Sequence, residues 1–301
     1  MPVKLFLSDL DGTLLNQQAQ LSPTSLETLR TLLERGLPFS VASARTPFSV
    51  LPLLEGLPLR LPWILMNGAL IYAPVEAHCP YTCPLTPCEW AALARAERES
   101  GVAGLLFTLE EGRVRCHCAP SAPPPLQHYF DRAALRHYPV LWNGFGRRAA
   151  WELENTPLLY GMYLDHRPEA LARMAEGLGK AGLTLDFYQD IYTSSRWYLE
   201  VYSAGASKGA AVNWLRRNCG FSPIVGFGDG YNDQSLFAAC EEGYAVSNAC
   251  PELKRQATGI IGSNVQDGVA VYLKERWKRE TDSAGEPLFF KHGLQVPGLS
   301  P

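Results

Sequence analysis

Two aspartates near the start of the chain, Asp9 and Asp11, are residues whose type and spacing could do chemistry. They follow a short apolar run, Leu5–Leu7, and precede Gly12 and Thr13. Because side chains alternate along an extended chain, both carboxylates point to the same side, where they can share a divalent cation and take different protonation duties. Gly12 permits a sharp turn, and Thr13 offers a hydroxyl and an N–H group. The pattern indicates a metal-binding catalytic turn, with a simple capped turn as the alternative.

Further polar residues that could join this chemistry occur far along the chain: Ser43, Lys208, Asp229, Asn232 and Asp233. Several carboxylates at one edge of a sheet would repel one another without a cation, and hard oxygen ligands with room for water suit Mg²⁺. The lysine and the serine hydroxyl are instead donors for phosphate oxygens. A cation in a first helical turn is unfavourable, which favours a ligand role for Lys208. Anion donors beside a magnesium site indicate a phosphoryl-transfer centre.

Alternating strands and helices must position these residues. Apolar runs that end in small polar clusters predict strands, and proline-led amphipathic segments between them predict helices. This alternation predicts an α/β fold with a Rossmann-like parallel sheet, in which ligands bind beyond the carboxyl ends of the strands. The predicted strands of this sheet after the first one are 37–42, 63–66, 197–202, 224–227, 244–246 and 259–261.

The middle of the chain has a different texture. A capping box at 86–89 predicts a helix, and the segments on both sides of 110–112 predict a hairpin. We therefore expect a discontinuous catalytic core of residues 1–83 and 191–280, an inserted α/β domain at 84–190, and a C-terminal tail at 281–301.

Composition restricts the class of protein. The chain has 301 residues, of which 47% are hydrophobic and 19% charged, and its net charge is -3. This net charge gives no signal of the basic surface that nucleic-acid binding needs, so we expect no nucleic-acid partner. It has no apolar stretch of membrane-spanning length, and the first strand begins almost at Met1, so we expect no membrane partner, no signal peptide and a cytoplasmic location. Eight cysteines without paired Cys-x-x-Cys spacing indicate reduced thiols rather than disulfides or a zinc site.

Four motifs occur in order along the chain: Asp9-Leu10-Asp11-Gly12-Thr13 is the first, Ser43-Ala44-Arg45 the second, Ser207-Lys208-Gly209 the third and Gly228-Asp229-Gly230-Tyr231-Asn232-Asp233 the fourth. Three further signatures are Asn67-Gly68-Ala69, Ser247-Asn248-Ala249 and Gln266-Asp267-Gly268-Val269. In this order and spacing, they resemble the motifs of the haloacid dehalogenase (HAD) superfamily, and specifically of Cof-type phosphatases with a type IIB cap. The resemblance covers the chain up to about residue 280. It implies the HAD fold for the core and a substrate-selecting cap for the inserted domain. The second motif departs from the usual Thr-Gly-Arg but keeps the hydroxyl and the guanidinium.

The resemblance also implies a mechanism, that of a Mg²⁺-dependent phosphoric monoester hydrolase. Asp9 would attack phosphorus to form an aspartyl-phosphate, and Asp11 would act as general acid and base. Mg²⁺ would be held by Asp9, the backbone carbonyl of Asp11 and Asp229, with Asp233 as a ligand or a nearby acid. Arg45 would contact substrate or pair with a carboxylate of the core. The residues implied in substrate and phosphate binding are Leu10, Ser43, Ala44, Arg45, Asn67, Gly68, Lys208 and Asn232.

Several functions remain open at this level. The leading one is hydrolysis of small phosphorylated metabolites, with sugar phosphates first and cofactors such as flavin mononucleotide or pyridoxal phosphate behind. A phosphomutase, or a glycosyl-phosphoglycerate or sucrose-phosphate phosphatase, would use the same core. A non-catalytic regulator that binds a phosphometabolite is the alternative from another class. Asp9 and Asp11 argue against the regulator, because a binding protein would not need the second acid.

Overall fold

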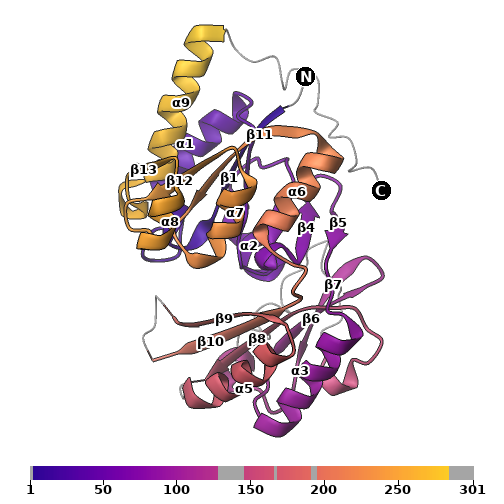
Figure 1. Cartoon of the computed structure of the whole chain (residues 1–301). Coiled ribbons are helices and arrows are strands. Elements are labelled where there is room, and N and C mark those ends of the chain that lie inside the picture. The colour runs from indigo at the N-terminus through magenta and orange to yellow at the C-terminus, as the bar shows by residue number, and fades with distance from the viewer. Residues whose placement is uncertain (1–2, 128–145, 166–167, 191–194, 285–301) are drawn as a thin grey trace. The chain divides into compact units, whose positions relative to one another are not determined.

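The computed structural model describes residues 3–127, 146–165, 168–190 and 195–284 (Figure 1). The chain divides into two compact units. The first unit consists of Met1–Glu76 and Ser207–Pro301, and the second of Ala77–Ala206. The first is therefore built from both ends of the chain. Among the described residues, no helix has the length and apolar character needed to cross a membrane.

A five-stranded parallel sheet forms the centre of the first unit. Its strands lie in the order β13-β12-β11-β1-β2. Leu5, Phe6 and Leu7 of β1 are at most 1% exposed, as expected for a strand whose two faces are both covered. The predicted α/β fold with a parallel core sheet is confirmed. The strands are β1 (Val3–Ser8), β2 (Phe39–Val41), β11 (Phe221–Gly228), β12 (Glu242–Val246) and β13 (Gly259–Ile261).

Helices cover this sheet, and local sequence signals set where they begin. Ser22 accepts a hydrogen bond from the N–H of Ser25, and Pro23 is the first residue of α1. Ser207 caps α6 in the same way, through the N–H of Ala210. In Figure 1, α1 lies beside α9 and α6 lies beside α7. The helices are α1 (Pro23–Glu34), α2 (Pro47–Leu54), α6 (Lys208–Cys219), α7 (Gln234–Ala239), α8 (Pro251–Gln256) and α9 (Gly268–Ala284).

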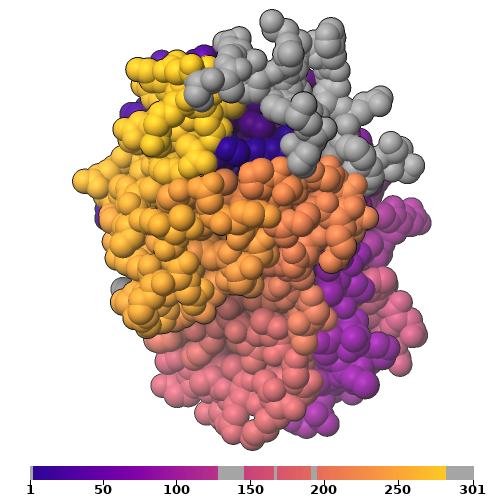
Figure 2. All heavy atoms as spheres, turned by 45° about the horizontal axis from the view of Figure 1, so that its top comes forward, coloured from indigo at the N-terminus to yellow at the C-terminus, as the bar shows by residue number. Residues whose placement is uncertain are grey.

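The last helix of the first unit, α9, extends beyond residue 280, where the expected core ends. It continues to Ala284 and forms the yellow surface in Figure 2. Two ion pairs attach it to the sheet: Arg276 to Glu242 of β12 at 3.1 Å, and Glu280 to Lys4 of β1 at 2.6 Å. The first four residues of the expected tail thus belong to this helix. The remainder of the tail, 285–301, lies outside the described residues.

A short hairpin extends the first unit beside β2. It consists of β3 (Trp63–Leu65) and β4 (Leu70–Ala73), which pair in antiparallel fashion around a turn at Met66–Gly68. A parallel bridge joins Ala42 to Ile64. The predicted strand at 63–66 therefore lies alongside the end of β2, but the chain then turns back and pairs β3 with β4 rather than extending the parallel sheet.

The second unit has an antiparallel sheet in the order β7-β6-β8-β10-β9. One of its faces packs on α3 and α5 to form an apolar core. The predicted capping box is present at Thr86 and Glu89, and β6 and β7 form the predicted hairpin. The elements are β5 (His78–Thr82), α3 (Pro87–Ser100), β6 (Leu105–Glu110), β7 (Arg113–Cys118), β8 (Leu158–Asp165), α5 (Pro168–Lys180), β9 (Thr184–Gln189) and β10 (Trp197–Tyr202).

One strand lies in a different sheet from the one expected. The segment 197–202 was expected in the parallel core, but β10 pairs with β8 and β9, antiparallel to both. Leu199 and Val201 are fully buried in the core of the second unit, and Glu200 lies on the other face between them. Such alternation is typical of an antiparallel strand with two unlike faces, whereas a central parallel strand is apolar on both. The expected insertion at 84–190 lies within the second unit.

Candidate active site

The carboxyl edge of the parallel sheet brings the first and fourth motifs together. Ser8 of β1 is in register with Phe227 of β11. The N–H of Asp9 donates to the carbonyl of Phe227 at 2.9 Å. Because neighbouring parallel strands end at one edge, Asp9 and Asp229 both leave the sheet there.

Three carboxylates gather at this edge. Asp9, Asp229 and Asp233 each offer an oxygen, and these oxygens lie within 4.8 Å of one another. Asp233 is fully buried, and its Oδ2 accepts from the N–H groups of Asp229 (3.0 Å) and Gly230 (3.1 Å). The hydroxyl of Thr13 donates to Asp229 Oδ1 at 2.8 Å. The loop after β11 is thus folded around the Asp233 carboxylate.

One buried lysine faces this cluster. Lys208, at the start of α6, is 1% exposed. Its Nζ lies 2.7 Å from Asp9 Oδ1 and 2.6 Å from Asp233 Oδ1. Burial alone would lower the pKa of Lys208, but the charges of Asp233 and Asp9 raise it above its ordinary value. The side chain is therefore an ammonium ion that orients both carboxylates.

A single ammonium does not neutralise three carboxylates, and the pKa values of Asp9 and Asp229 reflect this. Burial raises the pKa of Asp9 well above its ordinary value, against the opposing charge of Lys208, and Asp233 and Asp229 raise it further. Burial and the charge of Asp233 raise the pKa of Asp229 to about 6. A divalent cation would relieve this repulsion, and a set of carboxylate oxygens is the donor type that Mg²⁺ prefers. The donor set fits a magnesium ion.

Two glycines permit the motifs to approach this closely. Gly12 has φ +75°, and a Cβ at this position would overlap Asp229 Oδ2. Gly68 has φ +90°, and a Cβ there would overlap the carbonyl oxygen of Ser207, directly before Lys208. Both positions thus require glycine for conformation and for space.

The second carboxylate of the first turn has a cation of its own. Arg45 Nε donates to Asp11 Oδ2 and Arg45 Nη2 to Asp11 Oδ1, both at 2.6 Å. The backbone N–H of Arg45 donates to Ser43 Oγ at 3.1 Å. Of the two roles open to Arg45, the structure shows pairing with a core carboxylate. The Asp11 carboxylate is not part of the three-carboxylate cluster.

The signature that contains Asn67 and the fourth motif meet through their amides. Asn232 Nδ2 donates to Asn67 Oδ1 at 3.0 Å. Asn67 is 1% exposed, with φ +52° in the turn between β3 and β4, and its backbone N–H donates to the carbonyl of Ser43. Leu10 and Ala44 follow Asp9 and Ser43 directly in their turns. Every predicted site residue thus lies in the first unit.

The family model of haloacid dehalogenase-like hydrolases matches residues 6–118 and 152–273, which is most of the chain. The chain belongs to this family. A pyridoxal phosphate phosphatase of Escherichia coli (strain K12) is 24% identical to the hydrolase over 294 residues, with 91% of this chain and 98% of the relative covered. The predicted family is confirmed.

Solved structures agree with this assignment. A haloacid dehalogenase-like hydrolase from Bacteroides thetaiotaomicron has a TM-score of 0.71 and 24% identity, with 91% of this chain and 99% of that chain covered. A HAD subclass IIB sugar phosphatase has a TM-score of 0.66 and 18% identity, with coverages of 91% and 99%. At this identity the likeness shows the fold, which is the HAD fold with its cap.

Two asparagines that are distant in sequence form hydrogen bonds with the backbone of the first turn, and the sequence analysis assigned a role to neither. Asn248 Nδ2 donates to the carbonyl of Gly12 at 2.7 Å, and Asn264 Nδ2 to that of Leu15 at 2.9 Å. The N–H of Asn264 in turn donates to Asn248 Oδ1. Asn248 lies in one of the closing motifs, which was a signal for it, whereas nothing in the sequence singles out Asn264.

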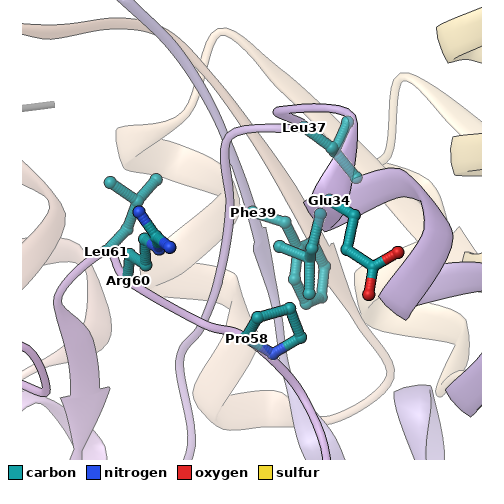
Figure 3. Close-up of a pocket in the computed structure, with 7 residues that line it drawn as sticks. Glu34, Leu37, Phe39, Pro58, Arg60 and Leu61 are labelled. Carbon is teal, nitrogen blue, oxygen red and sulfur yellow. The ribbon is translucent and has the colours of Figure 1, made fainter. Parts of the chain in front are cut away.

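A cavity of about 250 Å³ lies elsewhere in the first unit, beside the amino end of β2 (Figure 3). Leu37, Phe39 and Leu61 line it, and Glu34 and Arg60 add one charge of each sign. The carboxylates described above follow the carboxyl ends of the strands, so this cavity is at the opposite edge of the sheet. It takes no part in the site.

Proposed function

We propose that this hydrolase is a Mg²⁺-dependent phosphatase that hydrolyses small phosphomonoesters through an aspartyl-phosphate on Asp9. The observation that carries the proposal is the cluster of Asp9, Asp229 and Asp233 around Lys208 at the carboxyl edge of the sheet. A buried, oriented carboxylate beside a site for a divalent cation is what nucleophilic attack on a phosphate requires.

Asp9 is the nucleophile in this scheme. Lys208 holds its Oδ1, and the hydrogen bond from its N–H to Phe227 holds its backbone. Attack forms a bond between the Asp9 carboxylate and phosphorus and breaks the bond to the leaving oxygen. Asp11 gives its proton to that oxygen and later removes a proton from the water that hydrolyses the aspartyl-phosphate.

Asp9, the backbone carbonyl of Asp11 and Asp229 would hold the magnesium ion. When bound, the ion offsets the repulsion between carboxylate and phosphate and stabilises charge on the transferring group. Asp233 supports this set without binding the metal, because its Oδ1 accepts from Lys208 and its Oδ2 from two N–H groups of the Asp229 loop. We therefore assign Asp233 to orienting Lys208 and Asp229.

We assign the phosphate to hydroxyl, amide and ammonium donors carried by the turns after β2, β3 and β11 and by the start of α6. Ser43 is buried at the end of β2, and Lys208 bridges two carboxylates. The paired amides of Asn67 and Asn232 would supply further donors. The N–H groups of Leu10 and Ala44 complete the set, with Gly68 shaping the turn that carries Asn67.

Sugar phosphates are the substrate class we put first, with phosphorylated cofactors second. The relatives support both: one solved structure is a sugar phosphatase, and the E. coli relative is a pyridoxal phosphate phosphatase. We assign the choice of substrate to the inserted α/β cap, expected at 84–190. A phosphomutase or a binding regulator remains the alternative, distinguished by whether free phosphate is released.

The test is phosphate release from a panel of phosphorylated sugars and cofactors, with Mg²⁺ or with a chelator. Asp9→Asn removes the nucleophile, and Asp282→Asn, on the exposed surface of α9, is the matched control. We expect Mg²⁺-dependent turnover that falls at least about 10³-fold in Asp9→Asn and is unchanged in Asp282→Asn. Equal turnover by wild type and Asp9→Asn would refute the covalent scheme.

A further inference from the structure

The ion pair between Arg45 and Asp11 has the geometry of a positioning device. Two parallel hydrogen bonds of 2.6 Å join the guanidinium to both oxygens of the carboxylate. The two side chains are 23% and 30% exposed. A forked pair fixes the orientation of the carboxylate.

The backbone of Arg45 is anchored on both sides. Its N–H donates to Ser43 Oγ, and its carbonyl accepts from the N–H of Met66 at 3.1 Å. The N–H of Ser43 donates to the carbonyl of Ile64 in β3 at 2.9 Å. The Arg45 side chain therefore extends from a loop whose backbone is fixed by hydrogen bonds to Ser43 and to the end of β3.

The first turn thus has two carboxylates with separate cations. Lys208 contacts Asp9 at 2.7 Å, and Arg45 contacts Asp11 at 2.6 Å. Lysine is a compact point charge, whereas the arginine fork fixes a carboxylate plane. A nucleophile needs one free oxygen and charge compensation, while a proton donor needs a fixed direction toward the leaving oxygen.

We propose that Arg45 is the positioning residue for Asp11, and that it serves expulsion of the leaving group rather than binding of the phosphate. This inference rests on the proposed function. As Asp9 bonds to phosphorus and the bond to the leaving oxygen breaks, the Asp11 proton passes to that oxygen, and Arg45 holds the carboxylate that remains. The same carboxylate then takes a proton from the attacking water, which restores Asp11.

Two substrates with different leaving groups separate this role from phosphate binding. An alkyl phosphate such as glycerol phosphate needs protonation of its leaving alkoxide, whereas p-nitrophenyl phosphate releases a stable phenolate without it. For a reaction through a covalent intermediate, kcat/KM reports the steps up to release of the leaving group. A phosphate anchor would affect both substrates equally.

The experiment measures kcat/KM on both substrates for wild type, Arg45→Ala, Arg45→Lys, Asp11→Asn and the double variant Asp11→Asn/Arg45→Ala. We expect Arg45→Ala to lose about 10- to 100-fold on the alkyl phosphate and less than about threefold on the aryl phosphate. Arg45→Lys should fall between. In the Asp11→Asn background, Arg45→Ala should cost nothing further on the alkyl phosphate.

Equal losses on the two substrates, or additive losses in the double variant, would overturn the proposal and make Arg45 a phosphate anchor. The ratio of the two rates in one preparation does not depend on the folded fraction, so a partly unfolded variant still gives a result. Arg255→Ala, which removes an exposed pair with Glu252, is the control. Loss of the proposed function itself is recognised separately, because wild type and Asp9→Asn would then not differ on either substrate.

Discussion

At the scale of single residues, the site depends on a charge balance that one lysine maintains. Lys208 is buried against Asp9 and Asp233, and both carboxylates lie within 3 Å of its Nζ. Breaking a buried pair by removing one partner leaves an uncompensated charge, which is costly, whereas an exposed pair contributes little. A lysine in an exposed ion pair therefore serves as the control for a substitution of Lys208.

Lys208→Met should destabilise the protein by about 3 kcal/mol or more at neutral pH and abolish turnover, because Asp9 and Asp233 lose their shared cation. Lys180→Met, which breaks an exposed pair with Glu176 on α5, should change neither property measurably. Denaturant unfolding and phosphate release provide the two readouts. A Lys208→Met protein as stable as wild type would show that the two carboxylates are held by other contacts.

At the scale of elements, tight turns at the ends of β1 and β3 allow motifs far apart in sequence to meet. Gly12 and Gly101 both have left-handed backbone conformations, with φ of +75° and +66°. A Cβ at Gly12 would overlap Asp229, whereas a Cβ at Gly101, which ends α3, has no described atom within 4 Å. An alanine at Gly101 would therefore introduce backbone strain alone, whereas an alanine at Gly12 would also crowd the Asp229 carboxylate.

Gly12→Ala and Gly101→Ala should both cost about 1 kcal/mol of stability through backbone strain. In addition, Gly12→Ala should lower kcat/KM at least about 100-fold, because the Asp229 carboxylate must leave its present position in the cluster. Thermal unfolding and steady-state kinetics on the two variants test this. Full activity in Gly12→Ala would mean that the turn can relax without disturbing the carboxylates.

Sequence patterns predict helices and strands better than they predict which strands pair and which side chains contact each other. The parallel core and the motif positions follow from apolar runs and capping signals, because these are local. The sheet that takes up β10 depends on pairing with β8, more than 30 residues away. In the same way, Arg45 and Asp11 are recognisable as charged motif residues, but their pairing depends on how two loops meet. Asn264 contacts Leu15 across most of the chain, and no local signal marks it.

At the scale of the whole molecule, the carboxylate cluster links folding stability to pH and to metal. Burial and the charge of Asp233 raise the pKa of Asp229 to about 6 in the folded protein, against about 3.9 in an unfolded chain. Between about pH 4 and pH 6 the folded protein binds more protons than the unfolded chain, so its stability falls as the pH rises through this window. The full penalty is present above pH 6 when no cation neutralises the cluster.

Asp229→Asn should therefore increase the free energy of unfolding of the metal-free protein at pH 7.5 by about 1–3 kcal/mol and raise its melting temperature. At pH 4 the substitution should change the melting temperature little. Asparagine keeps the Oδ1 that accepts from Thr13, and Lys208 keeps both of its partners, so the change removes charge without removing these contacts. Mg²⁺ should raise the melting temperature of wild type at pH 7.5 but not that of Asp229→Asn. Thermal unfolding of wild type and Asp229→Asn at both pH values, with Mg²⁺ and with a chelator, tests these expectations. If the variant is less stable than wild type at pH 7.5 without metal, then attraction to Lys208, rather than repulsion among the carboxylates, dominates the site.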